Sequence, residues 1–226
     1  MVRSSDPVMA LTDLTLDELR IAMAGELADA AIFDGWSMAA VDNAAANLEL
    51  PLALARVAFA DGPMAMIGAW IAAIDADMAR ALPAEAMAVL PIRERIRRLV
   101  QFRLDAVTGR EEALRRALAI MAMPQNVAAA LRLGWNSADA MWRLAGDTAT
   151  DFNHYTKRTT LAALYAATLA VFVDDQSEDK AATRAFLDRR IAGVMRFEKA
   201  KARWLRPADE RFSLVRLAGR LRYPAV

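Results

Sequence analysis

The spacing of apolar residues constrains this chain more than any other feature. Apolar positions recur at helical intervals along nearly all 226 residues, and no segment alternates apolar with polar residues as an amphipathic strand does. The pattern predicts an all-α fold. Because the chain has no cysteine, disulfides and thiolate chemistry are excluded. Its net charge of +1 provides no global attraction to nucleic acid.

Helix start and stop signals divide the pattern into segments. Thr15 and Glu18 form a capping box that begins the first helix, and Gly35 breaks the chain after it. Ser37 caps a short second helix, and Pro51 suits the first position of a third. Further helices are predicted over 63–82, 91–108, 110–123, 125–133, 138–145 (capped by Ser137) and 151–173, and a last long one begins at Ser177.

Three short helices before a bundle of longer ones resemble the order of TetR regulators, in which a helix-turn-helix unit precedes a ligand-binding core. We therefore expect three parts: a helix-turn-helix-like unit over 1–60, a helical core over 61–205 and an amphipathic tail over 206–226.

The segment in the DNA-reading position, LELPLALARVAF, carries one cation, Arg56, and one anion, Glu49. Phosphate contacts need Lys or Arg, and base reading needs polar groups that this segment lacks. We interpret the unit as a scaffold without DNA-reading function, packed by Trp36, Val41, Leu48 and Phe59.

A polar stretch, GDTATDFNHYTKR (146–158), contains the single histidine of the chain, His154. One histidine without a Glu-x-x-His motif does not make a metal centre, and the chain has no G-x-S-x-G elbow, so neither metal ligands nor catalytic residues are predicted. The simplest interpretation is a capped helix start with Lys157 and Arg158 on its surface. An alternative is a patch of exposed aromatic groups that binds a protein partner.

A longer set of motifs surrounds this stretch: AD-x-x-W, AGD-x-x-x-D, YTKR and T-x-x-FL-x-x-RI, in order between 135 and 191. The set resembles the ubiquinone (coenzyme Q) biosynthesis lipid-binding accessory proteins, also labelled the rpsU-divergently transcribed family. The resemblance implies a TetR-like fold without known DNA binding and a cavity for lipid or polyprenyl quinone precursor. It also implies a surface that docks a ubiquinone-pathway hydroxylase. We predict no enzymatic activity and no cofactor.

Carried over to this chain, the resemblance assigns the docking surface to six residues. At one of them the mitochondrial members carry tryptophan where this chain has His154, which leaves the identity of the hydroxylase open. The six residues are Asp139, Met141, Trp142, Leu144, His154 and Tyr155.

The apolar helices that follow residue 63 could enclose a lipid or could simply pack as a core. Periodicity alone favours a core, whereas the resemblance favours a cavity. Methionine suits a variable lipid because its side chain is unbranched. The predicted lining residues are Met66, Trp70, Phe102, Met121, Met123, Trp135, Leu161, Leu164, Tyr165, Leu169 and Phe172.

The tail is basic and amphipathic, which is typical of a helix lying in a membrane interface. A helix that docks on the bundle or on a second subunit is the alternative. We expect a homodimer on the cytoplasmic face of the inner membrane. The predicted membrane-contact residues are Phe212, Leu214, Val215, Arg216, Leu217, Arg220, Leu221 and Arg222.

The sequence thus predicts an accessory protein that presents a quinone precursor to a hydroxylase at the membrane. The rival interpretation is a TetR-type transcriptional regulator that senses a lipophilic ligand, for which a basic reading helix would be the discriminating feature. A third interpretation is an enzyme that acts on the ring, for which the sequence has no cofactor motif or convergent acid–base set.

Overall fold

The structure, a computed structural model, describes residues 11–148 and 152–204. Helices account for nearly all of this part of the chain, and no strand occurs among the described residues, which confirms the all-α prediction. The chain divides into two compact units, 1–188 and 189–226, and the boundary between them falls inside the last helix. The membrane-contact residues predicted between 206 and 226 lie outside the described residues.

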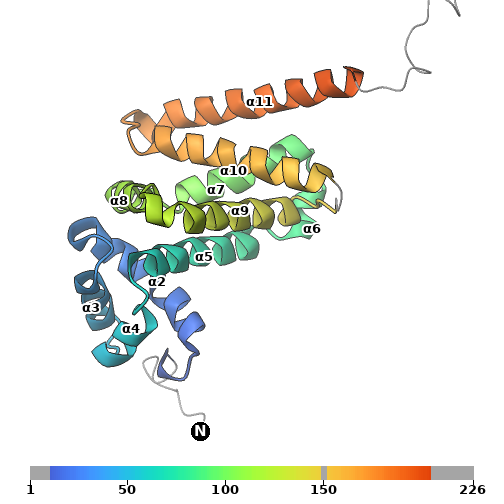
Figure 1. Cartoon of the computed structure of the whole chain (residues 1–226). Helices are drawn as coiled ribbons and strands as arrows, with labels where there is room; N and C mark the ends of the chain where they lie inside the picture. The colour runs from blue at the N-terminus through green and yellow to red at the C-terminus, as the bar shows by residue number, and fades with distance from the viewer. Residues whose placement is uncertain (1–10, 149–151, 205–226) are drawn as a thin grey trace, which may run out of the picture. The chain divides into compact units, whose positions relative to one another are not determined.

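The first three helices form where the capping signals predicted. Helix α2 (Leu16–Asp34) begins with the Thr15–Glu18 capping box and ends at Gly35, whose φ of 67° favours glycine. The Ser37 side chain accepts from the Ala40 amide and begins α3 (Met38–Asn47). Pro51 is the cap of α4 (Leu52–Ala58) rather than its first residue. In Figure 1 these helices lie together at one end of the bundle.

The bundle that follows contains α5 (Pro63–Ala81), α6 (Ala84–Ala88), α7 (Ile92–Asp105) and α8 (Glu111–Met121). Helix α2 packs on α3, α5 and α8, so the N-terminal unit shares its core with the bundle. The Trp36 side chain makes this connection directly: its Nε1 donates to the Ala113 carbonyl at 2.9 Å, and its ring lies 5.3 Å from that of Trp70.

One prediction in the middle of the chain is wrong. Two helices with a break at Ser137 were expected, but a single helix, α9 (Val127–Leu144), follows the short 3-10 turn η1 (Pro124–Asn126). The Ser137 hydroxyl does not cap. It donates to Asp75 Oδ2 at 3.2 Å and accepts from Arg103 Nη2 at 3.1 Å, so a long-range polar contact explains a residue that resembled a start signal. Figure 1 shows α9 beside α5 and α10 (Phe152–Phe172).

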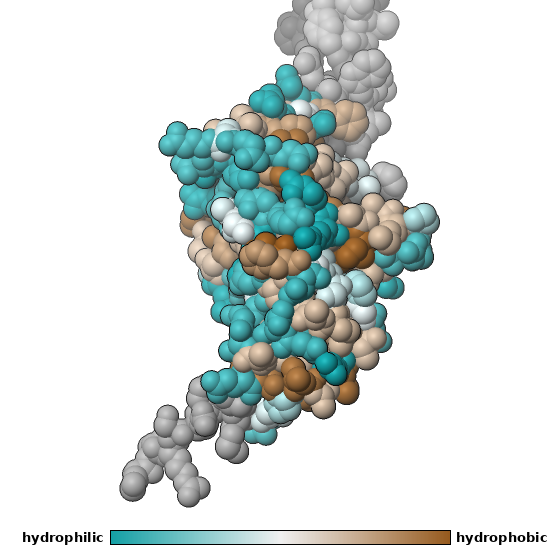
Figure 2. All heavy atoms as spheres, turned by 90° about the vertical axis from the view of Figure 1, so that its left-hand side faces the viewer, coloured by the Kyte–Doolittle hydropathy of each residue, from teal (hydrophilic) through white to brown (hydrophobic). Residues whose placement is uncertain are grey.

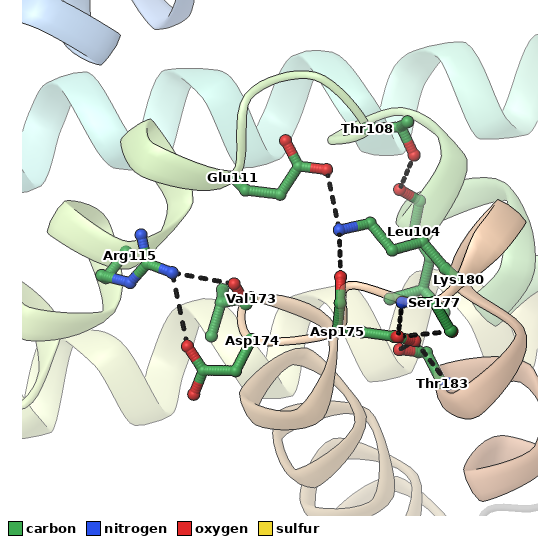
Figure 3. Close-up of polar contacts among 10 residues, drawn as sticks. All are labelled: Leu104, Thr108, Glu111, Arg115, Val173, Asp174, Asp175, Ser177, Lys180 and Thr183. Atoms are coloured by element: carbon green, nitrogen blue, oxygen red, sulfur yellow. Dashed lines mark hydrogen bonds and ion pairs between the residues drawn. The ribbon is translucent and has the colours of Figure 1, made fainter.

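The start of the last helix also differs from the prediction. Ser177 precedes a 3-10 turn, η2 (Glu178–Lys180), and α11 (Ala181–Trp204) begins only at Ala181, because Asp179 and Lys180 have positive φ. The group that organises this turn is Asp175, at the centre of Figure 3.

The Asp175 carboxylate accepts four hydrogen bonds. Its Oδ1 accepts from the amide and hydroxyl of Ser177 at 2.9 and 2.5 Å, and its Oδ2 from those of Thr183 at 2.7 and 2.6 Å. Burial opposes the charge, but these hydrogen bonds outweigh it and hold the pKa of Asp175 well below its usual range. Lys180 completes the turn by bridging the Asp175 carbonyl at 2.9 Å and Glu111 at 3.1 Å (Figure 3).

Among the described residues, no single helix is both long and apolar enough to cross a membrane; only α4 and α5 pass that test as a pair, with a bend of 89° between them. On the face drawn in Figure 2, hydrophobic side chains gather in separate patches among hydrophilic ones. Such scattered apolar groups are ordinary on a protein surface.

Candidate functional site

A cavity of about 610 Å³ lies between α5, α7, α8, α9 and α10. Its wall is almost entirely apolar, with α9 and α10 contributing the largest share. A volume of this size falls within the range of small-molecule and lipid sites. The full wall consists of Ile67, Trp70, Ile71, Ile74, Arg103, Val107, Leu114, Ala117, Leu118, Met121, Ala122, Val127, Ala130, Leu131, Leu133, Gly134, Trp135, Ser137, Thr159, Ala162, Ala163, Tyr165, Ala166 and Leu169.

The structure brings five of the eleven predicted lining residues to this wall and leaves six elsewhere. The five are Trp70, Met121, Trp135, Tyr165 and Leu169. Of the six that are absent from the wall, four are buried between helices, Phe102 is half-buried and Met123 is exposed. A large apolar side chain on a helix can pack against other helices as readily as it can line a cavity. The six are Met66, Phe102, Met123, Leu161, Leu164 and Phe172.

Many of the wall residues that the prediction missed are small. Ala130 and Gly134 are four apart on α9, and Ala162 and Ala166 are four apart on α10, so each pair shares one helix face. Small side chains on packed helices leave volume between them. The four-residue spacing of small side chains was therefore the signal in the sequence that could have indicated the cavity.

One group of polar side chains interrupts the apolar wall. Arg103 is buried, and its guanidinium pairs through Nη1 with Asp75 and donates through Nη2 to Ser137. Its Cζ lies 4.8 Å from the ring centroid of Tyr165, in cation–π contact. Burial raises the pKa of Asp75, whereas Arg103 and the Ser137 hydroxyl favour its charged form.

The 146–158 stretch contains a buried ion-pair network rather than surface charges. Arg158 was expected on the helix surface, but its side chain is only 3% exposed. Its Nε donates to Asp139 at 2.5 Å and its Nη1 to Asp147 at 3.0 Å, while Lys157 Nζ reaches Asp147 at 2.6 Å. These bonds fix the end of α9 against the start of α10.

A cluster of rings lies near the start of the same helix, α10. Tyr155, whose exposed fraction is 61%, stands 5.2 Å from His154 and 6.0 Å from Trp135 between ring centroids. His154 and Trp135 are 6.2 Å apart. Because Trp135 also lines the cavity, this one side chain connects the cavity to the exposed aromatic surface.

The other predicted docking residues occupy different depths. Met141 is fully buried, so it belongs to the core beneath the surface and cannot contact a partner there. Trp142 and Leu144 are half-buried, and the Trp142 Nε1 donates to the Lys157 carbonyl at 3.0 Å. Asp139 is paired with Arg158 and Arg143. We name the five predicted docking residues other than Met141 the 139–155 surface: Asp139, Trp142, Leu144, His154 and Tyr155.

The helix-turn-helix-like unit offers little to DNA. Arg56, the one cation between 48 and 58, donates twice to Asp42, at 2.8 and 2.7 Å. This hydrogen bonding lowers the pKa of Asp42. Helix α4 exposes two large apolar side chains, Leu52 and Val57, and neither can pair with a phosphate. Among the described residues, no group of three or more acidic or histidine side chains could hold a metal ion.

The fold defines a class first: an all-helical protein with TetR-regulator architecture. The structure is similar to the crystal structure of a TetR transcriptional regulator from Nitrosomonas europaea, with a TM-score of 0.62 and 22% sequence identity, covering 79% of this chain and 98% of that one. At this identity the likeness concerns the fold alone.

Sequence comparisons show which proteins the chain is homologous to. Residues 127–198 match the COQ9 family model. The chain is 36% identical over 168 residues to the mitochondrial ubiquinone biosynthesis protein COQ9 of Rattus norvegicus, covering 71% of this chain and 54% of that protein. For the Homo sapiens protein the identity is 34%, with coverage of 71% and 52%. This chain therefore contains a COQ9-family domain and is a homologue of these proteins, and it spans about half the length of the curated relatives it matches.

Proposed function

We propose that this protein is a non-enzymatic accessory protein of ubiquinone biosynthesis. It binds the isoprenoid chain of a quinone precursor in the cavity and presents the ring to a pathway hydroxylase docked on the 139–155 surface. The observation that carries the proposal is Trp135, which lines the apolar cavity and packs against the exposed Tyr155. The homology to ubiquinone biosynthesis proteins supports the choice of pathway.

The apolar cavity supports the lipid part of the proposal. Moving an isoprenoid chain out of a bilayer is unfavourable unless other apolar contacts replace those of the hydrocarbon. A wall of Ile, Leu, Val, Ala and Met side chains supplies such contacts. The volume of about 610 Å³ accommodates several isoprene units, so a longer chain would extend past the exposed wall residues Val127 and Leu131.

The 139–155 surface supports the docking part. Exposed aromatic side chains held rigidly are frequent anchors of protein interfaces, because they bury a large area at a small entropy cost. Tyr155 is such a side chain, and Arg158, three residues further along the same helix, ties that helix to Asp139 and Asp147 through hydrogen bonds. Attachment of residues 206–226 to the inner membrane completes the proposal, and the family resemblance supports it; a homodimer stays an expectation.

Reconstitution tests the proposal as a whole. Vesicles containing a prenylated ubiquinone precursor are incubated with a ubiquinone-pathway hydroxylase from the same organism, with and without this protein. We expect the protein to accelerate ring hydroxylation, and Tyr155→Ala to remove most of the acceleration. The same rate with and without the protein would contradict the proposal. Turnover by this protein alone would identify an enzyme instead.

A further inference from the structure

The cavity opens on one side of the bundle. Two of its wall residues on α9, Val127 and Leu131, are large apolar side chains that are 42% and 70% exposed. On α10 the wall residues Thr159, Ala163 and Ala166 are exposed as well. Because α9 and α10 pack side by side (Figure 1), these five residues place the mouth of the cavity between the first half of α9 and the middle of α10.

An apolar stripe continues from the mouth onto the surface. Val127 and Leu131 are four residues apart and share one face of α9. Met123, which is not a wall residue, lies four residues before Val127 and is 43% exposed. One exposed apolar side chain is ordinary, but a run of them beside the opening of an apolar cavity indicates a contact surface. We call Met123, Val127 and Leu131 the mouth stripe.

The charge around the mouth favours an anionic surface as the partner. Neither residues 113–138 nor residues 152–173 contain an acidic residue. Arg132, next to Leu131, is exposed, and its side chain has no ion pair or hydrogen bond within the described part of the chain. An exposed cation beside exposed apolar side chains is typical of a surface that lies on anionic lipid.

We propose that the mouth of the cavity lies against the bilayer, with the mouth stripe among the acyl chains and Arg132 at the lipid headgroups. The inference rests on the proposed function and adds the route by which the cavity is loaded. An isoprenoid chain then passes from the bilayer into the cavity without exposing its apolar surface to water, which would be unfavourable. The tail attaches the protein to the membrane, and the mouth stripe determines which face turns towards it.

Two other occupants of the mouth stripe conflict with the proposed function. A second copy of this chain would cover the mouth and close the route by which the ligand enters. The hydroxylase has a surface of its own, because Leu131 and Trp142 are eleven residues apart on α9, about 16 Å along the helix at nearly the same angular position. The bilayer and the hydroxylase therefore occupy neighbouring parts of one face of α9.

A single fluorescent label tests the orientation directly in the full chain. Because the chain has no cysteine, Met123→Cys provides a unique position for an environment-sensitive dye. The matched control is Val57→Cys, at another exposed apolar side chain, on α4. With phosphatidylcholine–phosphatidylglycerol vesicles, we expect the emission at position 123 to shift to shorter wavelength and to be quenched by spin-labelled phospholipid. The emission at position 57 should not change.

Transfer of ligand from vesicles tests the loading route. Met123→Asp should slow the transfer of a fluorescently labelled farnesol from vesicles to the protein by roughly tenfold, the factor for losing the burial of one large apolar side chain. Binding of a neutral fluorescent naphthylamine from solution should stay within about twofold of the unsubstituted protein, because Met123 does not line the cavity. Val57→Asp should change neither quantity.

The outcomes separate this inference from the proposed function. If the protein sediments with vesicles while the dye at position 123 is unchanged, or if both labelled positions respond alike, the orientation is wrong and attachment through the tail stands. A shift that appears without vesicles as the protein concentration rises would make the stripe an interface between copies and overturn the inference. If position 123 responds to vesicles as expected but no labelled farnesol is taken up, the membrane contact stands and the lipid cavity fails. If the protein does not bind vesicles at all, both fail.

Discussion

Filling the cavity from Gly134 should raise stability and lower ligand affinity at once. Gly134 lies in the interior of α9 and lines the cavity, and a Cβ built on it meets no atom within 4 Å. In a packed core the same substitution would clash and destabilise the protein. Gly134→Leu therefore distinguishes a real cavity from a core.

The magnitude has two parts. Replacing glycine by leucine in a helix interior contributes about 0.8 kcal/mol. Burying the leucine side chain against apolar walls contributes up to about 2 kcal/mol, less where the wall does not enclose it. We expect a total gain of about 1–3 kcal/mol, and Tm should rise by about 2–4 °C per kcal/mol for a chain of this size.

The assay is thermal unfolding of the delipidated protein, together with binding of a neutral fluorescent naphthylamine as a probe of the cavity. The matched control is Gly25→Leu in α2, where a Cβ also meets no atom within 4 Å but no cavity lies. Both variants should gain stability from helix propensity. Only Gly134→Leu should weaken probe binding, by at least about fivefold, because the leucine occupies volume that the probe needs. A lower Tm for Gly134→Leu with unchanged probe binding would refute the cavity.

Four further predictions follow from named contacts. Asp175→Asn should lower the free energy of unfolding by about 2–3 kcal/mol above pH 5. The carboxylate has a lower pKa in the folded protein than in the unfolded chain, where it is near 4, so its charged form stabilises the fold only above about pH 4. In urea unfolding, the difference between the variant and the unsubstituted protein should therefore shrink as the pH falls below 4, and a constant difference would contradict the prediction. Arg158→Met should cost about 3 kcal/mol, because it removes the buried partner of two carboxylates and leaves Asp139 with Arg143 and Asp147 with Lys157. Arg143→Met, at a side chain that is 75% exposed, should change the stability by no more than about 0.5 kcal/mol in the same unfolding assay, and equal losses would show that burial does not matter there. Tyr155→Ala should weaken capture of the hydroxylase by roughly tenfold or more without lowering Tm much, and normal capture would remove this residue from the surface. Deleting 206–226 should abolish sedimentation with anionic liposomes, and undiminished sedimentation would exclude the tail as the membrane contact.

Local signals predicted most of the helices but could not predict contacts between distant segments. The Thr15–Glu18 capping box and the Gly62-Pro63 start depend on neighbouring residues, and both helices begin where expected. Ser137 carries the same local signal as a cap, yet its hydroxyl bonds Asp75 and Arg103 from other helices. Nothing within its own segment of sequence distinguishes the two roles.

The candidate site was predictable in outline and not in its polar details. Aromatic residues such as Trp70 and Trp135 were expected at the cavity and do line it, because large apolar side chains on inward faces meet there. Arg103 was missed, since an arginine on a basic amphipathic helix normally faces water. The burial of Arg158 was missed too, because an arginine usually lies at the surface and its partner Asp139 is 19 residues away in the sequence.

Native mass spectrometry of the freshly purified full chain, followed by solvent extraction of whatever is bound, tests the central claim most directly. The proposed function predicts a bound lipid, with a prenylated quinone precursor enriched when the hydroxylase is absent from the producing cells. A chain that carries nothing, and that takes up no precursor from vesicles, would contradict it.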